Sequence, residues 1–302
     1  MLESLFKLSA NGTNVRTEIL AGITTFLTMA YIIFVNPSIL SAAGMDHGAV
    51  FVATCLAAAA GTLIMGLYAN YPVALAPGMG LNAYFTYGVV QGMGIGWPVA
   101  LGAVFVAGIL FLILSLLPVR EWIINAIPRS LKLAISAGIG LFLAIIGLQK
   151  AGIVVDHPVT LVTLGDMSKP EVLLAVAGFV LMVVLGARRV PGAMIIAILA
   201  VTAASLALGI SDFGGVFSLP PSLAPTFMRM DVAGALESGL VAVVLAFLII
   251  DLFDTAGTLI GLAQRSGLLD AQGRLPRLRQ ALLADSGATV IGAAMGTSTT
   301  TS

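Results

Sequence analysis

The amino-acid sequence predicts an all-α polytopic membrane protein, and three observations lead to that fold class. Of the 302 residues, 59% are apolar and only 9% are charged, whereas soluble domains carry about 25% charged residues. The apolar residues form long runs, and a helix needs about 20 such residues to cross a bilayer. Lysine and arginine gather in alternate connections between these runs.

Nine membrane spans are expected after a polar start at residues 1–18, which favours a short surface helix. The first span is expected at 19–40, and it is longer than the core of a signal peptide, which has about 7–15 residues. Asn36-Pro37 is expected to end or kink this span, because proline disrupts the helix before it. The other spans are expected at 49–68, 73–90, 98–117, 131–148, 171–186, 192–208, 236–261 and 281–295.

The distribution of positive charges places the N-terminus in the cytoplasm. In this orientation, cytoplasmic segments carry 11 of the 14 Lys and Arg residues, and outside segments carry the other 3. Positive residues accumulate on the cytoplasmic side of membrane proteins. Adding or removing one span would scramble this alternation, so the count also supports nine spans. The expected location is the cell membrane, with multiple passes through the lipid bilayer.

The third span is expected to be discontinuous. Pro77, Gly78 and Gly80 interrupt its apolar run, ALAPGMGLNAYFTYG. Proline removes a backbone donor, and glycine permits irregular backbone. Within a membrane, such backbone is tolerated only where it is buried in protein or lines a water-filled cavity.

A second interruption is expected at Thr297–Ser302, which would begin a tenth span. This run is rich in threonine, a β-branched residue that favours extended structure. The two interrupted spans are seven apart, which indicates two seven-span repeats, and an odd number of spans makes the second repeat inverted. Paired interrupted spans mark the substrate site of many secondary transporters.

The eighth span carries two acidic residues, Asp251 and Asp254, within the apolar stretch 245–261. An acid at the centre of a bilayer costs a few kcal/mol and faces a cavity or the bundle interior. The pair therefore either holds a polar ligand or packs against a hydroxyl of a neighbouring helix. Asp285, in the ninth span, is interpreted as an interfacial acid near the arginines of the preceding loop.

Several classes of function are excluded by composition. One cysteine, Cys55, allows neither an intramolecular disulfide nor a cysteine metal cluster. His47 and His157 are expected in loops, so the spans hold no nucleophile–base pair or metal ligands, and no enzyme activity, metal or cofactor is expected. Balanced charges, 14 positive and 14 negative, give no indication of nucleic-acid binding. The charged residues within the spans are too few for a channel.

Four segments, in the right order and spacing, resemble the adenine/guanine/hypoxanthine permease family of the nucleobase–cation symporters, within the xanthine/uracil permease superfamily. The similarity runs along the whole chain. The resemblance implies fourteen spans in two inverted seven-span repeats, with short strands in spans 3 and 10. This chain would hold spans 1–9 and the start of span 10. The segments are TTFLTMAYIIFVNPSIL at 24–40, LAPGMGLNAYFTYG at 75–88, DLFDTAGTLIG at 251–261 and GTSTTTS at 296–302.

The resemblance also implies a division into domains. After the cytoplasmic N-terminus at 1–18, spans 1–4 at 19–130 would belong to a core domain. Spans 5–7 at 131–235 would form part of a gate domain, and residues 236–302 would return to the core with spans 8–10. The resemblance further implies a homodimer.

The activity implied is secondary active transport of purine nucleobases, adenine, guanine and hypoxanthine, across the cytoplasmic membrane by proton symport. By position, Asp254 matches the acid that binds the base, and Asp251 is a secondary member of the site. Both acids are assigned to proton coupling. The other binding positions implied are Asn82, Gly80, Leu81, Thr258, Thr299 and Thr300.

Two alternatives stay open. The chain ends before the acid expected in span 10 and lacks spans 11–14, so it would be an inactive fragment of such a permease. The same fold also carries uracil, xanthine or anions, although a buried acid disfavours an anion. No motif selects one purine, or a proton over sodium.

Overall fold

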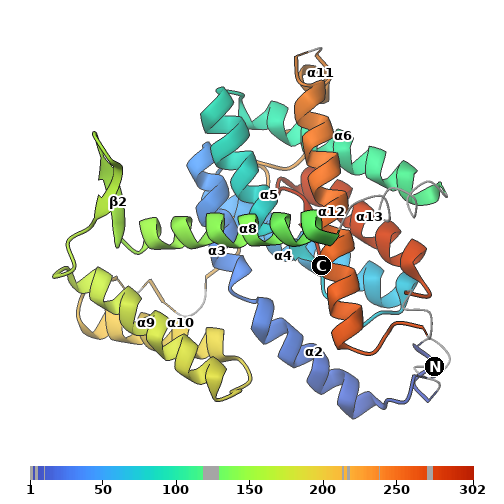
Figure 1. The fold of residues 1–302 in the computed structure, drawn as a ribbon, viewed down its shortest axis with the longest axis horizontal. Coiled ribbons are helices and arrows are strands. Elements are labelled where there is room, and N and C mark those ends of the chain that lie inside the picture. Colours follow the sequence, from blue (N-terminus) through green and yellow to red (C-terminus); the bar gives the residue numbers. More distant parts are fainter. Residues whose placement is uncertain are drawn as a thin grey trace. The chain divides into compact units, whose positions relative to one another are not determined.

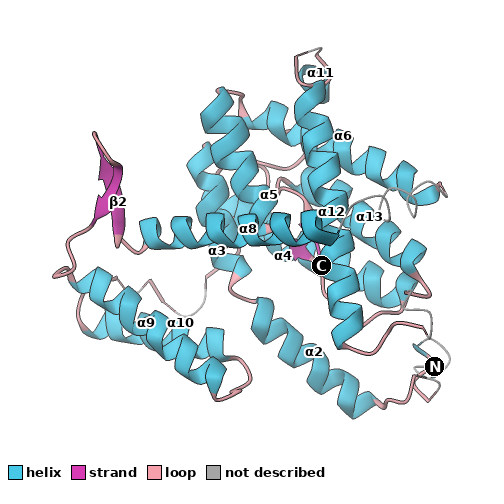
Figure 2. Ribbon diagram, in the orientation of Figure 1, coloured by secondary structure: helices cyan, strands magenta, loops and turns pink. Residues whose placement is uncertain are grey.

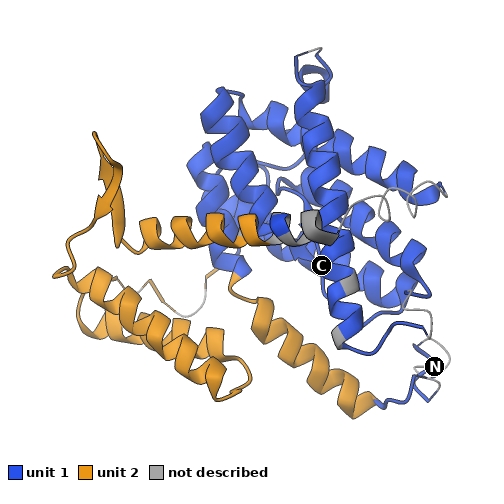
Figure 3. Ribbon diagram, viewed as in Figure 1, with its two compact units in different colours: residues 1–14, 32–136, 220–302 blue, residues 15–31, 137–219 orange. Residues whose placement is uncertain are grey.

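A computed structural model describes residues 3, 6–9, 11–117, 129–212, 214–215, 218–237, 239–270 and 275–302. The chain divides into two compact units, which Figure 3 colours separately. Unit 1 comprises Met1–Asn14, Ile32–Ser136 and Pro220–Ser302, and unit 2 comprises Val15–Tyr31 and Ala137–Leu219.

Unit 1 is a helical bundle that holds one pair of very short strands (Figures 1 and 2). Three of its described helical segments are not α-helical: η1 is a 3₁₀ helix, which is wound more tightly than an α-helix, and η2 and η3 are π-helices, which are wound more widely. In chain order its elements are α3 (Ile32–Leu40), η1 (Ser41–Ala43), α4 (His47–Ile64), η2 (Met65–Ala69), β1 (Ala76–Pro77), α5 (Met79–Ala83), η3 (Tyr84–Gly92), α6 (Trp97–Leu116), α11 (Val232–Ala235), α12 (Val241–Arg265), α13 (Leu278–Met295) and β4 (Thr300–Thr301).

Helix α13 lies at the centre of this bundle and packs against both α4 and α6. Small residues permit the close approach. A Cβ atom added to Gly61 of α4 would lie 2.8 Å from the Cβ of Ala288, and one added to Gly108 of α6 would lie 3.0 Å from Thr289 Cγ2. Because small residues let helix backbones approach closely, the α4–α13 and α6–α13 contacts are tight.

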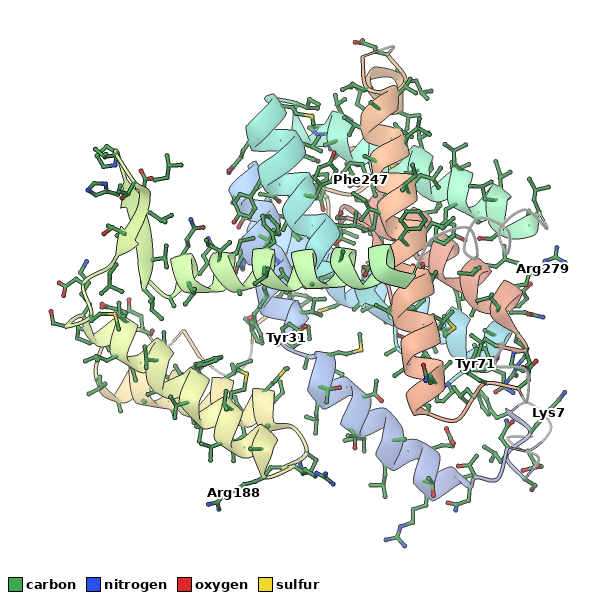
Figure 4. All side chains as sticks on the ribbon, in the orientation of Figure 1. Lys7, Tyr31, Tyr71, Arg188, Phe247 and Arg279 are labelled. Atoms are coloured by element: carbon green, nitrogen blue, oxygen red, sulfur yellow. The ribbon has the colours of Figure 1, made fainter. Side chains whose placement is uncertain are left out.

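Aromatic residues fill the space between η3 and α12. The fully buried ring of Phe247, labelled in Figure 4, meets Tyr84 edge to face with 5.3 Å between the ring centroids. The ring of Phe85 is tilted against Phe247, with 6.4 Å between the ring centroids. At the opposite end of the bundle, the guanidinium of Arg277 stacks over Tyr71, 4.6 Å from the ring centroid. These contacts hold α12 and the start of α13 against the interrupted third span.

Unit 2 holds a β-hairpin and long apolar helices. Strands β2 and β3 pair antiparallel, with Val154 opposite Leu164. Helices α9 and α10 pack on each other, and a Cβ on Gly178 would lie 2.5 Å from Val201 Cγ2. The elements are α2 (Val15–Met29), α8 (Arg129–Lys150, which begins in unit 1), β2 (Val154–His157), β3 (Leu161–Leu164), α9 (Pro170–Ala187) and α10 (Ala193–Ala207).

The described residues contain five helices that are long and apolar enough to cross a membrane. A polytopic membrane protein is therefore confirmed. Part of the expected surface helix within 1–18 lies outside the described residues. The five helices are Val15–Ala43, His47–Ala69, Trp97–Leu116, Pro170–Ala187 and Val241–Gln264.

The interruption expected at Asn36-Pro37 lies elsewhere. The turn in the first span falls at Ala30–Tyr31, and Pro37 lies inside α3. Pro37 is the sixth residue of this nine-residue helix, beyond the first turn, so the absence of its N–H removes one helical hydrogen bond, the one to the Ile33 carbonyl. A single missing donor there is tolerated.

Candidate functional site

The two segments in which the sequence predicts interruptions lie side by side in unit 1. Strand β1 pairs antiparallel with β4, with Ala76 opposite Thr301 and Pro77 opposite Thr300. The N–H of Gly78 extends the pairing by donating to the Thr299 carbonyl at 2.9 Å. Figure 2 draws this pair beside α12.

Two threonines bind the backbone next to and within these strands. The Thr62 hydroxyl of α4 accepts the N–H of Leu75 at 3.0 Å and donates to the carbonyl of the same residue at 3.2 Å. The Thr289 hydroxyl of α13 accepts the N–H of Thr300 at 3.1 Å and donates to its carbonyl at 3.0 Å. The interrupted backbone therefore has partners on both helices, as burial requires.

Asp254 lies on α12, half-buried and next to the strand pair. A Cβ atom built on Gly78 would lie 3.8 Å from Asp254 Oδ2 and 2.8 Å from Thr301 Cγ2. Among the described residues, nothing donates a hydrogen bond to the Asp254 carboxylate. The carboxylate is therefore free to accept bonds from a ligand beside Gly78.

Asp251, although only three residues earlier, points to a different neighbour. Its side chain is 1% exposed, and its Oδ2 accepts a long hydrogen bond of 3.4 Å from Thr289 of α13. Its Oδ1 has no partner within the described part of the chain. Asp251 and Asp254 thus face α13 and the β1 segment respectively.

The interpretation of Asp285 as an interfacial acid is wrong. Its side chain is fully buried, and its Oδ2 accepts a 2.6 Å hydrogen bond from the Thr255 hydroxyl. That hydroxyl also lies 3.3 Å from Thr301 Oγ1. The ninth span begins at Leu278, earlier than expected, so Asp285 lies two turns inside the helix. A buried carboxylate needs such a partner.

Asn82 belongs to a fully buried network of side chains. Its amide nitrogen donates to Asn36 Oδ1. The amide nitrogen of Asn36 donates to Thr54 Oγ1 at 2.7 Å and to Thr297 Oγ1 at 2.9 Å. This network joins α3, α4, α5 and the segment before β4. Asn82 Oδ1 has no partner among the described residues.

Gly80 and Leu81 lie in the first turn of α5, directly after β1. The first backbone N–H that bonds within this helix is that of Asn82, to the Gly78 carbonyl at 2.9 Å. Helices leave the N–H groups of their first turn without helical partners. Gly78 supplies no capping side chain. The start of α5, directly after Gly78, therefore has backbone N–H groups without helical partners.

The three threonines that the resemblance places in the site have different surroundings. The Thr258 hydroxyl lies 2.9 Å from Ser302 Oγ and donates to the Asp254 carbonyl. The Thr300 hydroxyl donates to the Ala288 carbonyl at 3.1 Å, which turns it toward α13. The Thr299 hydroxyl is buried and has no partner among the described residues.

The arrangement combines an acceptor and donors suited to a polar organic ligand. An unpaired carboxylate accepts N–H groups, while backbone N–H groups and a hydroxyl donate to a carbonyl or ring nitrogen. In the described ranges, no group of three or more His, Cys, Asp or Glu residues is placed to hold a metal ion.

Comparisons with known proteins relate the chain to permeases. Residues 16–302 match the model of the permease family that comprises the xanthine/uracil permeases. The chain is 58% identical over 301 residues to a putative permease of Methanocaldococcus jannaschii, covering 99% of this chain and 69% of that protein. It is 48% identical to the adenine permease AdeP of Escherichia coli over 100% of this chain and 68% of AdeP. The identity to the guanine/hypoxanthine permease PbuO of Bacillus subtilis is 47%, over 98% of this chain and 70% of PbuO.

Proposed function

Because the chain belongs to the xanthine/uracil permease family, a family of transporters and not of enzymes, we propose that it carries purine nucleobases across the cell membrane. The observation that carries this proposal is the Asp254 carboxylate, which is unpaired among the described residues and adjoins the β1–β4 pair. Relatives at 46–48% identity are named as permeases for adenine or for guanine and hypoxanthine.

A purine fits the groups in this part of unit 1. Its ring N–H groups donate to the Asp254 carboxylate, and charge-assisted bonds of this kind are about twice as strong as neutral ones. The first-turn N–H groups of Gly80 and Leu81 donate to a purine carbonyl or ring nitrogen. The Thr299 hydroxyl and Thr258 complete the polar contacts. Asn82 and Thr300 stabilise the surrounding structure and do not donate to the purine, because their side-chain donors already bond to Asn36 Oδ1 and to the Ala288 carbonyl.

Two inverted seven-span repeats account for the paired interruptions. This proposal is supported by two threonines that make the same contact, Thr62 in the second span and Thr289 in the ninth. Each hydroxyl bonds to the backbone N–H and to the carbonyl of one residue in the following span. The helices that carry them meet at Gly61 and Ala288. The core domain at 19–130 and 236–302 and the gate domain at 131–235 remain a prediction. The contact units divide the chain after residues 14, 31, 136 and 219.

Transport is coupled to protons in this proposal. Asp254, with Asp251 one turn away, is a carboxyl group within a membrane span, and such groups form the proton relays of pumps and transporters. Alternating access then moves one domain against the other around the site. The cytoplasmic N-terminus and the homodimer stay predictions.

Uptake of radiolabelled bases tests the proposal. The complete reading frame that contains this chain is expressed in cells that lack their own purine permeases. We expect saturable uptake of adenine, guanine or hypoxanthine that is faster at an external pH of about 5.5 than at about pH 7.5, because a lower external pH increases the inward proton gradient that drives symport. Equal rates at both pH values would contradict proton coupling. Uptake of uracil, xanthine or sulfate in place of adenine, guanine and hypoxanthine would overturn the proposed choice of substrate.

A further inference from the structure

Thr62 and Thr289 make the same unusual contact at two places in the chain. Each hydroxyl accepts the N–H and donates to the carbonyl of a single residue, Leu75 or Thr300, at distances between 3.0 and 3.2 Å. A threonine in a helix ordinarily donates to a carbonyl of its own helix three or four residues earlier. These two hydroxyls bond across to another segment instead.

The contact provides hydrogen-bond partners for backbone groups that are buried within a membrane bundle. Every N–H and C=O there needs a partner, and the β1–β4 pairing involves only two residues on each strand. A hydroxyl is both a donor and an acceptor, so one threonine satisfies both groups of a residue that the pairing leaves open. Alanine, valine or leucine at the same position would leave both groups unpaired.

The two contacts also fix where the strands lie along α4 and α13. These helices touch at Gly61 and Ala288, the residues directly before Thr62 and Thr289. The strand pair and the helix crossing therefore form one block, which carries Gly78 and the first turn of α5. Displacing Leu75 would displace Gly78, where an added Cβ atom would lie 3.8 Å from Asp254 Oδ2.

We propose that Thr62 and Thr289 are positioning residues for the purine site, which set the β1–β4 pair at the distance from Asp254 that binding requires. This inference rests on the proposed function, and neither threonine needs to touch the purine. Thr62 gives the cleaner test, because Thr289 also contacts Asp251.

The test compares Thr62→Val, which removes the hydroxyl at nearly constant volume, with Thr62→Ser, which keeps it. We expect Thr62→Val to raise the KM for the purine by about tenfold, equivalent to about 1.4 kcal/mol of binding. Thr62→Ser should stay within about threefold of the unchanged protein, a difference of about 0.7 kcal/mol. Thr202→Val is the matched control, because within the described ranges the Thr202 hydroxyl bonds only to the Ile198 carbonyl of its own helix. It should change neither KM nor the maximal rate.

Hydrogen–deuterium exchange on the purified protein supplies a measurement that needs no purine. In Thr62→Val, the amide of Leu75 should exchange faster than in the unchanged protein, while peptides of α10 should not change. Unchanged exchange at Leu75 would show that the contact does not hold the strand. Faster exchange with an unchanged KM, or loss of all folded protein in Thr62→Val, would assign the threonine to the fold and overturn the positioning role. Absence of purine uptake by the unchanged protein would contradict the proposed function. It would not contradict the Thr62–Leu75 contact, which the exchange measurement tests without a purine.

Discussion

At the scale of single residues, the proposed chemistry depends on Asp254. Asp254→Asn keeps the shape of the side chain but replaces one acceptor oxygen with a donor, which opposes the N–H groups of a purine. We expect purine uptake to fall by about 10- to 100-fold, since mispairing a charged partner costs about 1.5–3 kcal/mol. The measurement is the initial uptake rate, divided by the amount of protein in the membrane.

The matched control for this substitution is Asp156→Asn, because Asp156 is an exposed acid on strand β2. It should retain full uptake. Normal uptake by Asp254→Asn would remove this carboxylate from the site and return attention to Asp251 and Asp285.

A second residue-scale prediction concerns Asn36. Asn36→Ala leaves the buried side chains of Asn82, Thr54 and Thr297 without the group they share, and each unsatisfied buried group costs about 1–3 kcal/mol. We expect a clearly lower midpoint of thermal unfolding for the detergent-purified protein. Asn11→Ala removes an exposed side chain whose one hydrogen bond among the described residues is to the Phe6 carbonyl, so it should leave the midpoint unchanged. Equal midpoints for both variants would contradict the network.

Asn36 also shows where prediction from sequence ends. An asparagine before proline in an apolar run indicates a helix break, and nothing nearby in the chain suggests another role. Its partners lie 18, 46 and 261 residues away. Asp254 was identifiable because a charge within an apolar span is conspicuous. Asp285 was misplaced because it stands close to arginines in sequence, whereas its partner, Thr255, lies on another helix.

At the scale of elements, most spans could be predicted because apolar runs of membrane length have few alternative structures. Interruptions were predictable where Pro77 and the neighbouring glycines make a helix costly. The turn at Ala30–Tyr31 has no such residue, and it coincides with the boundary between the two contact units. No residue at this position indicates a turn, so the sequence alone does not predict one there.

The crossing of α4 and α13 gives an element-scale prediction. A Cβ at Gly61 would lie 2.8 Å from Ala288 Cβ and 3.2 Å from Leu75 Cβ, so Gly61→Ala forces two helices apart. Such overpacking costs about 1–3 kcal/mol and should lower the unfolding midpoint. Gly66→Ala is the control, because a Cβ there meets nothing within 4 Å. If both variants unfold at the same temperature, the helices do not meet at Gly61.

At the scale of the whole molecule, the expected topology follows from the charges of the loops, and a single cysteine makes it simple to test. In a Cys55→Ser background, one new cysteine is placed at Val159, which is 82% exposed at the turn of the β2–β3 hairpin. Another replaces Arg189, an exposed residue between α9 and α10. One predicted span separates the two positions.

Positive residues accumulate on the cytoplasmic side, so Val159→Cys should face outward and Arg189→Cys inward. A membrane-impermeant maleimide should therefore label Val159→Cys in intact cells, and Arg189→Cys only after permeabilisation. The reverse pattern would invert the orientation and place the N-terminus outside. Labelling of both positions in intact cells would mean that α9 does not cross the membrane, which would remove a span and leave the seven-span spacing of the two interruptions without a basis.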